Sequence, residues 1–145
     1  MTIASIALKP ARCMSQETTL LEVARIMADE CVSQLPVCEG ERYAGMVDVG
    51  DVLGLIVPSG LPDLKFAGDM PGLVAAHARE LAGRHVRDAV VRDIPPLPEN
   101  CPLPEAAHLL SRHDRPLAVV DAAGRVKGLL GSCDLLAHVL NLAGA

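Results

Sequence analysis

The sequence has almost no aromatic side chains: its 145 residues include one Tyr, one Phe and no Trp. Proteins that read RNA or single-stranded DNA stack bases on aromatic rings, so this class of function is disfavoured. The formal net charge of −5 likewise opposes non-specific binding to phosphate backbones. Half of the residues are apolar, so the core must be built from aliphatic side chains. We therefore expect an aliphatic globular protein that does not bind nucleic acid.

Long apolar runs and export signals are also missing. No run approaches the roughly 18–20 residues that span a bilayer. The N-terminus lacks a basic stretch followed by a long apolar one. The cysteines are odd in number and form no C-x-x-C pair, so we expect free buried thiols in a cytoplasmic protein that does not associate with membranes. These thiols are Cys13, Cys31, Cys38, Cys101 and Cys133.

Signatures of catalysis and of metal binding are scarce as well. The sequence contains no nucleophile elbow, no P-loop and no paired-carboxylate motif. His108 and His113 are five residues apart, as are Cys133 and His138. This spacing does not place two metal ligands on one face of a helix. We expect neither enzyme activity nor a metal site.

What the sequence does contain is an internal repeat. Residues 18–57 align with residues 101–140 without a gap, at an offset of 83, and eight of the 40 pairs are identical. Many other pairs exchange one aliphatic residue for another. A long period that occurs twice indicates two duplicated halves rather than a solenoid. We predict a first repeat over 1–60, a connector with a helix over 61–84, and a second repeat over 85–145.

Each repeat has the pattern of a helix, a hairpin of two strands and a closing helix. Thr19-x-x-Glu22 is a capping box that precedes apolar residues at helical spacing. The short apolar run after this helix is bounded by turn residues, which indicates a buried strand. In the first copy we expect strands at 35–38 and 43–47, and a closing helix with Val52, Leu53 and Ile56 on one side.

The second copy gives the same order of elements. We expect a helix at 103–113, strands at 117–121 and 126–130, and a closing helix at 133–142. Between the copies, apolar spacing predicts a connecting helix from about 71 to 83. Three aliphatic residues just before the second copy are expected to pack on its core; these are Val90, Val91 and Ile94.

The ends of the two hairpins share a chemical pattern. Residues 45–51 (GMVDVGD) and 128–134 (GLLGSCD) each begin with Gly, continue through two aliphatic residues and place an Asp just inside the next helix. In the first helical turn, Asp51 and Asp134 lie among backbone amide donors. A carboxylate at this place can accept two hydroxyls of a ribose. The alternative is that each Asp only stabilises the start of its helix.

This order of motifs occurs twice in register, and it resembles a tandem pair of CBS (cystathionine β-synthase) domains, also called a Bateman module. Its elements are a helix, an L-P-V strand at 35–37, a glycine turn, and the Gly-to-Asp segment before a helix. The resemblance covers nearly the whole chain. It implies a mixed α/β (α+β) fold of duplicated βαββα repeats packed about a pseudo-two-fold axis. It also implies a cleft for an adenosine nucleotide between the repeats.

The resemblance implies roles for individual residues. Asp51 and Asp134 become the ribose-binding candidates, and the family places a Thr or Ser that helps to bind phosphate three residues earlier. In this sequence that position holds Asp48 in the first copy and Gly131 in the second. Asp48 has the wrong sign for a phosphate. Gly131 has no hydroxyl, but the adjacent Ser132 has one. The backbone at Gly131 carries no side chain, so its amide groups can donate hydrogen bonds to a phosphate.

Charge separates the two copies further. Acidic residues outnumber basic ones by five within 18–57, and the two kinds balance within 101–140. An anion is therefore expected to prefer the second copy, with Arg115 as a counter-charge near Gly131 and Ser132.

The function expected from the resemblance is that of a stand-alone regulatory or sensor protein. It would require no cofactor, bind AMP, ADP or ATP as a regulatory ligand, and form a homodimer. The alternative is a module whose clefts hold no ligand and whose role is dimerisation or binding to a partner. The two retained aspartates favour the first interpretation, and Asp48 and Gly131 favour the second.

Overall fold

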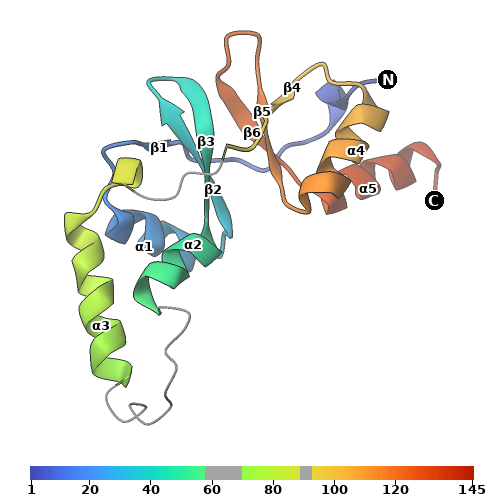
Figure 1. The fold of residues 1–145 in the computed structure, drawn as a ribbon. Coiled ribbons are helices and arrows are strands. Elements are labelled where there is room, and N and C mark those ends of the chain that lie inside the picture. The colour runs from blue at the N-terminus through green and yellow to red at the C-terminus, as the bar shows by residue number, and fades with distance from the viewer. Residues whose placement is uncertain (58–69, 89–92) are drawn as a thin grey trace.

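The computed structural model describes residues 1–57, 70–88 and 93–145. It contains two three-stranded sheets, one in each repeat. Their hairpins lie next to each other in the middle of the molecule (Figure 1). The helices of each repeat lie to the outside of this pair of sheets (Figure 1). The prediction of a duplicated mixed α/β fold is confirmed.

The two sheets have the same topology. In each, a short first strand pairs in parallel with the second strand, which pairs antiparallel with the third. The first sheet contains β1 (Met14–Ser15), β2 (Gln34–Glu39) and β3 (Arg42–Asp48). The second contains β4 (Leu97–Pro98), β5 (Leu117–Val120) and β6 (Val126–Leu130).

The helices follow the predicted order. They are α1 (Leu20–Glu30), α2 (Val49–Ile56), α3 (Met70–Glu80), α4 (Leu103–His113) and α5 (Ser132–Leu142). The connecting helix predicted to reach residue 83 ends as α3 at Glu80 and continues as a 3-10 turn, Leu81–Gly83. Of the residues expected to dock on the second core, Ile94 is buried, and Val90 and Val91 lie outside the described residues.

The first helix of each repeat, α1 or α4, ends in the same backbone conformation. Thr19 caps α1 as predicted, because its hydroxyl oxygen accepts the amide of Glu22 at 3.2 Å. Both α1 and α4 end on a residue in the left-handed conformation, Cys31 at φ 52° and Asp114 at φ 50°. These two residues occupy matched positions of the repeat, so the chain leaves both helices in the same direction toward its strand.

Each repeat has its own hydrophobic core, and β3 contributes to both. Val47 belongs to the core of the first repeat, whereas the preceding residue, Met46, is fully buried in the core of the second. Successive side chains of a strand point to opposite faces, so one strand can serve both cores. The two repeats are therefore packed through the inner faces of their sheets.

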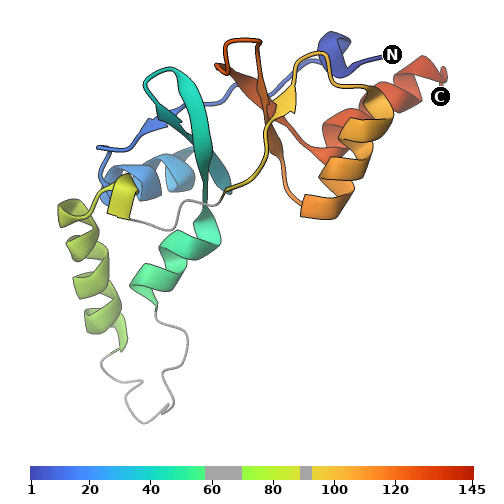
Figure 2. The same ribbon diagram turned by 45° about the horizontal axis from the view of Figure 1, so that its top comes forward.

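The first nine residues form an arm that belongs structurally to the second repeat. Ile3 donates a backbone hydrogen bond to Cys101, and Lys9 and Leu129 exchange two more at 3.1 and 3.0 Å. A Cβ atom at Gly128 would lie 2.8 Å from Leu8 Cβ, so only glycine allows this approach. Figure 2 shows the arm running from the helices of the second repeat toward the first sheet. The domain boundaries stay a prediction, but the arm links residues 1–9 to the distant repeat.

Tyr43, the chain's single tyrosine, joins the two repeats. Its hydroxyl donates a 2.7 Å hydrogen bond to the backbone carbonyl of Ile94, and its ring packs against the core of the second repeat. Burial, with a smaller effect of Asp93, raises the pKa of the Tyr43 phenol from 10.0 to about 12.

Titration of Tyr43 tests this packing directly, because Tyr43 is the only tyrosine and the chain has no Trp. We expect absorbance at 295 nm to show ionisation near pH 12 in the folded protein and near pH 10 in urea. The stability that the neutral phenol contributes is therefore complete below about pH 10 and is lost as the pH rises toward 12. A midpoint near 10 in the folded protein would contradict the buried position.

The structure corrects the interpretation of all five cysteines as free buried thiols. Cys13 and Cys38 form a disulfide, with 5.7 Å between their Cα atoms. Cys31 and Cys133 are exposed free thiols. Cys101 alone is free and buried; burial, with a smaller effect of Glu105, raises the pKa of its thiol. The parallel pairing of β1 with β2 brings Cys13 next to Cys38. The two residues are 25 positions apart in the sequence, so the sequence pattern alone does not show that they meet.

Peptide mapping without a reductant should recover Cys13 and Cys38 in one linked peptide. Breaking the bond with Cys13→Ser should lower the free energy of unfolding by about 3 kcal/mol, since the bond closes a loop of intermediate length. Cys133→Ser is the matched control and should change it by less than about 0.5 kcal/mol, because that thiol is exposed. Five reactive thiols in the unreduced, unfolded protein would argue against the disulfide.

Candidate functional site

The two hairpin ends differ in the carboxylate that bonds a backbone amide at the start of the next helix. At the start of α2, the Oδ1 atom of Asp48 accepts the amide of Gly50 at 3.2 Å. At the start of α5, the residue matched to Asp48 is Gly131, and its own amide donates to Oδ2 of Asp134 at 2.9 Å. A carboxylate therefore bonds a backbone amide at each helix start. In the first repeat it comes from the residue before the helix, and in the second from the third helical residue.

Asp134 lies at the edge of a cavity of about 380 Å3. Its side chain is 20% exposed, and its Oδ1 atom is 4.0 Å from the ammonium of Lys9 on the arm. The cavity is lined by Ser5–Ala7 of the arm and by His138, one turn after Asp134 on α5. One oxygen of Asp134 thus bonds Gly131 and the other lies next to a cation. An ionised carboxylate has about four acceptor positions, so this group can still accept hydroxyl donors.

Asp48 is paired with a cation from the other repeat. Its Oδ2 atom accepts a 2.9 Å hydrogen bond from Nη1 of Arg115, and about one fifth of each side chain is exposed. Arg115 follows α4, so this contact joins the two repeats. The sequence predicted Arg115 as a counter-charge near Gly131 and Ser132. In the structure its guanidinium bonds Asp48, and the next residue, Pro116, lies against Gly131, so the role of Arg115 toward a phosphate stays a prediction.

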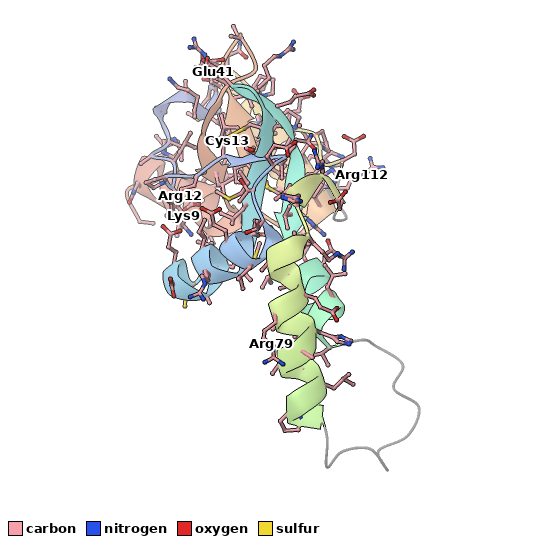
Figure 3. All side chains as sticks on the ribbon, turned by 90° about the vertical axis from the view of Figure 1, so that its left-hand side faces the viewer. Lys9, Arg12, Cys13, Glu41, Arg79 and Arg112 are labelled. Atoms are coloured by element: carbon pink, nitrogen blue, oxygen red, sulfur yellow. A yellow bond between two sulfur atoms is a disulfide. The ribbon has the colours of Figure 1, made fainter. Side chains whose placement is uncertain are left out.

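A second cavity, of about 350 Å3, lies between the repeats. Lys9 and Arg115 both line it, together with the segments after the two matched helices. These segments are Cys31–Gln34 and Asp114–Pro116. The cavity therefore contains two cations, and each of them is next to a carboxylate of a hairpin end. Figure 3 labels Lys9, Arg12 and Cys13 on the segment that leads from the arm into β1.

The remaining predicted residues lie elsewhere. Ser132 is exposed and lines a groove between α4 and α5, with Leu110 and Leu136 among its walls, rather than the cavity at Asp134. Asp51 is half-buried in the first turn of α2. The structure therefore brings Gly131 together with Asp134 and Arg115 together with Asp48, whereas Ser132 lines a different cavity from Asp134.

Three parts of the site were not predicted from the sequence. His138 lies four residues after Asp134 on the same helix, so their spacing carried a signal that both side chains share a face. Lys9 and Ser5–Ala7 carried no local signal, because they reach the site only through the pairing of the arm with β6.

Neither a metal site nor a membrane-spanning helix is present in the part of the chain that the structure describes. Within 1–57, 70–88 and 93–145, no three His, Cys, Asp or Glu side chains converge as the ligands of a metal ion would. In the same part of the chain, no helix combines the length and the apolar character that crossing a bilayer requires.

The fold and the site define a class: two βαββα repeats in tandem, each with an acidic residue in the first turn of its closing helix. A family model for the CBS domain matches residues 3–58 and again residues 86–141. The chain belongs to the CBS domain family and contains a tandem CBS pair. No curated protein matches the chain.

Solved structures of CBS-pair proteins have the same fold. CBSX2 from Arabidopsis thaliana superimposes with a TM-score of 0.78 at 20% identity, covering 99% of this chain and 97% of that one. CBSX2 in complex with AMP gives 0.71 at 21% identity, with 98% of both chains covered. A CBS domain-containing protein of unknown function from Kribbella flavida gives 0.73 at 21% identity, covering 96% and 99%. Likeness at these identities concerns the fold.

Proposed function

We propose that this chain is a regulatory CBS-pair protein without catalysis of its own, and that it binds AMP, ADP or ATP at the cavity beside Asp134. The observation that carries the proposal is the place of Asp134, a partly buried carboxylate at the edge of a cavity of about 380 Å3. The complex of the similar CBSX2 fold with AMP supports the choice of ligand class.

The groups around Asp134 suit a nucleotide. Its carboxylate would accept the two ribose hydroxyls while keeping its bond to the amide of Gly131. Ser5 and Ala7 have small side chains, which leave space for a flat base against the arm. Lys9 would offset the repulsion between Asp134 and a phosphate, since its ammonium is 4.0 Å from Oδ1.

We propose that the two clefts differ. Asp48 places a carboxylate at the position where the family resemblance expects a hydroxyl for phosphate, and the acidic excess of the chain lies in the first repeat. The second repeat has Gly131 there, whose amide is held by Asp134. One nucleotide per chain, on Asp134 rather than on Asp51, is the expected stoichiometry.

The Asp134→Asn variant tests this site by calorimetric titration with AMP. The amide oxygen of Asn can still accept the amide of Gly131, so the start of α5 is retained while the charge is removed. Hydrogen bonds to a charged group contribute about 1.5–3 kcal/mol, so we expect AMP affinity to fall about tenfold to a hundredfold.

Asp51→Asn is the matched control for that measurement and should leave AMP affinity unchanged. Equal losses in the two variants would reject the difference between the clefts. Absence of binding by the folded parent protein to AMP, ADP and ATP would reject nucleotide binding itself.

A specific observation favours the alternative of a module without a ligand. Neither Asp48 nor Gly131 supplies the hydroxyl that the family resemblance places before each ribose-binding Asp. In that case Asp134 only stabilises the start of α5, and the residues of the clefts only form the contact between the two repeats. The same titration separates the two functions.

The proposed location is the cytoplasm, as expected from the sequence. The Cys13–Cys38 disulfide weighs against it, because disulfides are rare in reducing compartments. The redox state of this pair in the protein isolated from cells therefore bears on location as well as on stability.

We also propose that the chain forms a homodimer through its closing helices. Four large apolar side chains of α5 are exposed, and Leu53 of α2 is 53% exposed. The four on α5 are Leu136 at 59%, Val139 at 39%, Leu140 at 46% and Leu142 at 54%. Exposed apolar side chains that gather on one helix in this way are typical of a contact with another protein.

Light scattering at micromolar concentration should give twice the chain mass of 15.2 kDa. Replacing Leu136 and Leu140 together by Asp should produce a folded monomer, because two charges would be buried without partners in the contact. Leu73→Asp on α3 is the control: this leucine is also exposed, at 38%, but lies on a different helix. A monomeric parent protein would contradict the proposed dimer.

A further inference from the structure

The cavity between the repeats contains an arrangement of charge that nucleotide binding at Asp134 does not by itself explain. Lys9 and Arg115 both line this cavity. Lys9 lies next to Asp134, the proposed ribose ligand, whereas Arg115 is bonded to Asp48 across the boundary between the repeats. A ligand held on Asp134 beside Lys9 therefore lies next to the cavity that also contains the guanidinium of Arg115.

We propose that Asp48 is an internal anion that occupies Arg115 until the phosphate of a nucleotide displaces it. This inference rests on the proposed nucleotide site at Asp134. The phosphate would take the place of the Asp48 carboxylate on Arg115, and Lys9 would contact it from the arm. Asp48 then acts as a specificity residue that sets how strongly the phosphate is bound.

The bonds of Asp48 suit such an exchange. Its two carboxylate oxygens have separate partners, Oδ1 the amide of Gly50 and Oδ2 the guanidinium of Arg115. Release of Arg115 would leave the bond to Gly50 in place, so the start of α2 keeps its cap. The side chain of Asp48 is 19% exposed, so water can reach the oxygen that Arg115 leaves.

Arg115 is equally suited to take a phosphate. A guanidinium has five N–H donors in a planar fork that matches phosphate geometry, and a phosphate carries more negative charge than a carboxylate. Of the donors of Arg115, Nη1 bonds Asp48 and Nε reaches the carbonyl of His113 at 3.4 Å. Asp114 also lines this cavity, so Lys9 and Arg115 together are needed to make it attractive to an anion.

The exchange has a consequence for regulation. Asp48 belongs to the first repeat and Arg115 to the second, so their hydrogen bond holds the repeats together. A phosphate bound to Arg115 would break this contact, and a ligand without a phosphate would leave it. Binding energy from the phosphate would in this way change the contact between the repeats.

Calorimetric titrations with AMP and with adenosine test the proposal, because the two ligands differ only in the phosphate. Asp48→Asn keeps an oxygen for Gly50 but removes the competing charge from Arg115. We expect this variant to bind AMP about tenfold more tightly than the parent, and adenosine with unchanged affinity. Arg115→Met should reduce the affinity for AMP toward that for adenosine and leave adenosine binding unchanged.

Arg12→Met is the matched control, since Arg12 is also an arginine in an ion pair, 3.7 Å from Glu30, but does not line the cavity between the repeats. It should change neither affinity. Adenosine affinity and the thermal unfolding midpoint report whether each variant is folded.

The outcomes separate the two proposals. Unchanged or weaker AMP binding by Asp48→Asn, or a preserved preference for AMP over adenosine in Arg115→Met, overturns the exchange and leaves nucleotide binding standing. If neither the parent nor Asp48→Asn binds AMP or adenosine while folded, the exchange and the proposed function are both rejected.

Discussion

The approach of the N-terminal arm to β6 is the contact on which the rest of the site depends. Two backbone hydrogen bonds between Lys9 and Leu129 fix the arm, and Gly128 permits them because a side chain at that position would collide with Leu8. The same contact buries Ile3 and Ile6 in the second core and carries Ser5–Ala7 to the cavity at Asp134. The site is thus built from the first residues of the chain and its last helix.

Local features could be predicted from the sequence because they depend on neighbouring residues. The cap of Thr19 on Glu22 and the bounds of α4 at Leu103–His113 agree with the sequence pattern, and the duplicated fold followed from the repeat. Three features could not be predicted: the arm, the Cys13–Cys38 disulfide and the Asp48–Arg115 pair. Each joins distant segments, 25 residues apart for the disulfide and 67 for the ion pair, and no local periodicity reports such contacts.

The two repeats share a backbone plan but differ in the chemistry at the start of their closing helices. Where the first repeat has Asp48, which accepts the amide of Gly50, the second has Gly131, whose amide donates to Asp134. A Cβ atom at Gly131 would lie 3.3 Å from Oδ2 of Asp134, so glycine leaves space for this inward turn. The residue at this position thereby decides whether a carboxylate caps the helix from the residue before it, as Asp48 does, or a backbone amide is free to bond Asp134, as that of Gly131 does.

The cations beside these carboxylates make the difference between the clefts larger. Lys9 is 69% exposed and 4.0 Å from Asp134, a weak and easily rearranged pair, whereas Arg115 is 21% exposed and bonded to Asp48 at 2.9 Å. A ribose that binds Asp134 therefore displaces little, whereas a phosphate that reaches Arg115 must compete with a sheltered ion pair. The proposed preference for the second cleft then rests on the cations that the arm and the end of α4 supply. Exchanging the motif residues alone would not reverse this preference, because Lys9 and Arg115 would remain where the arm and the end of α4 place them.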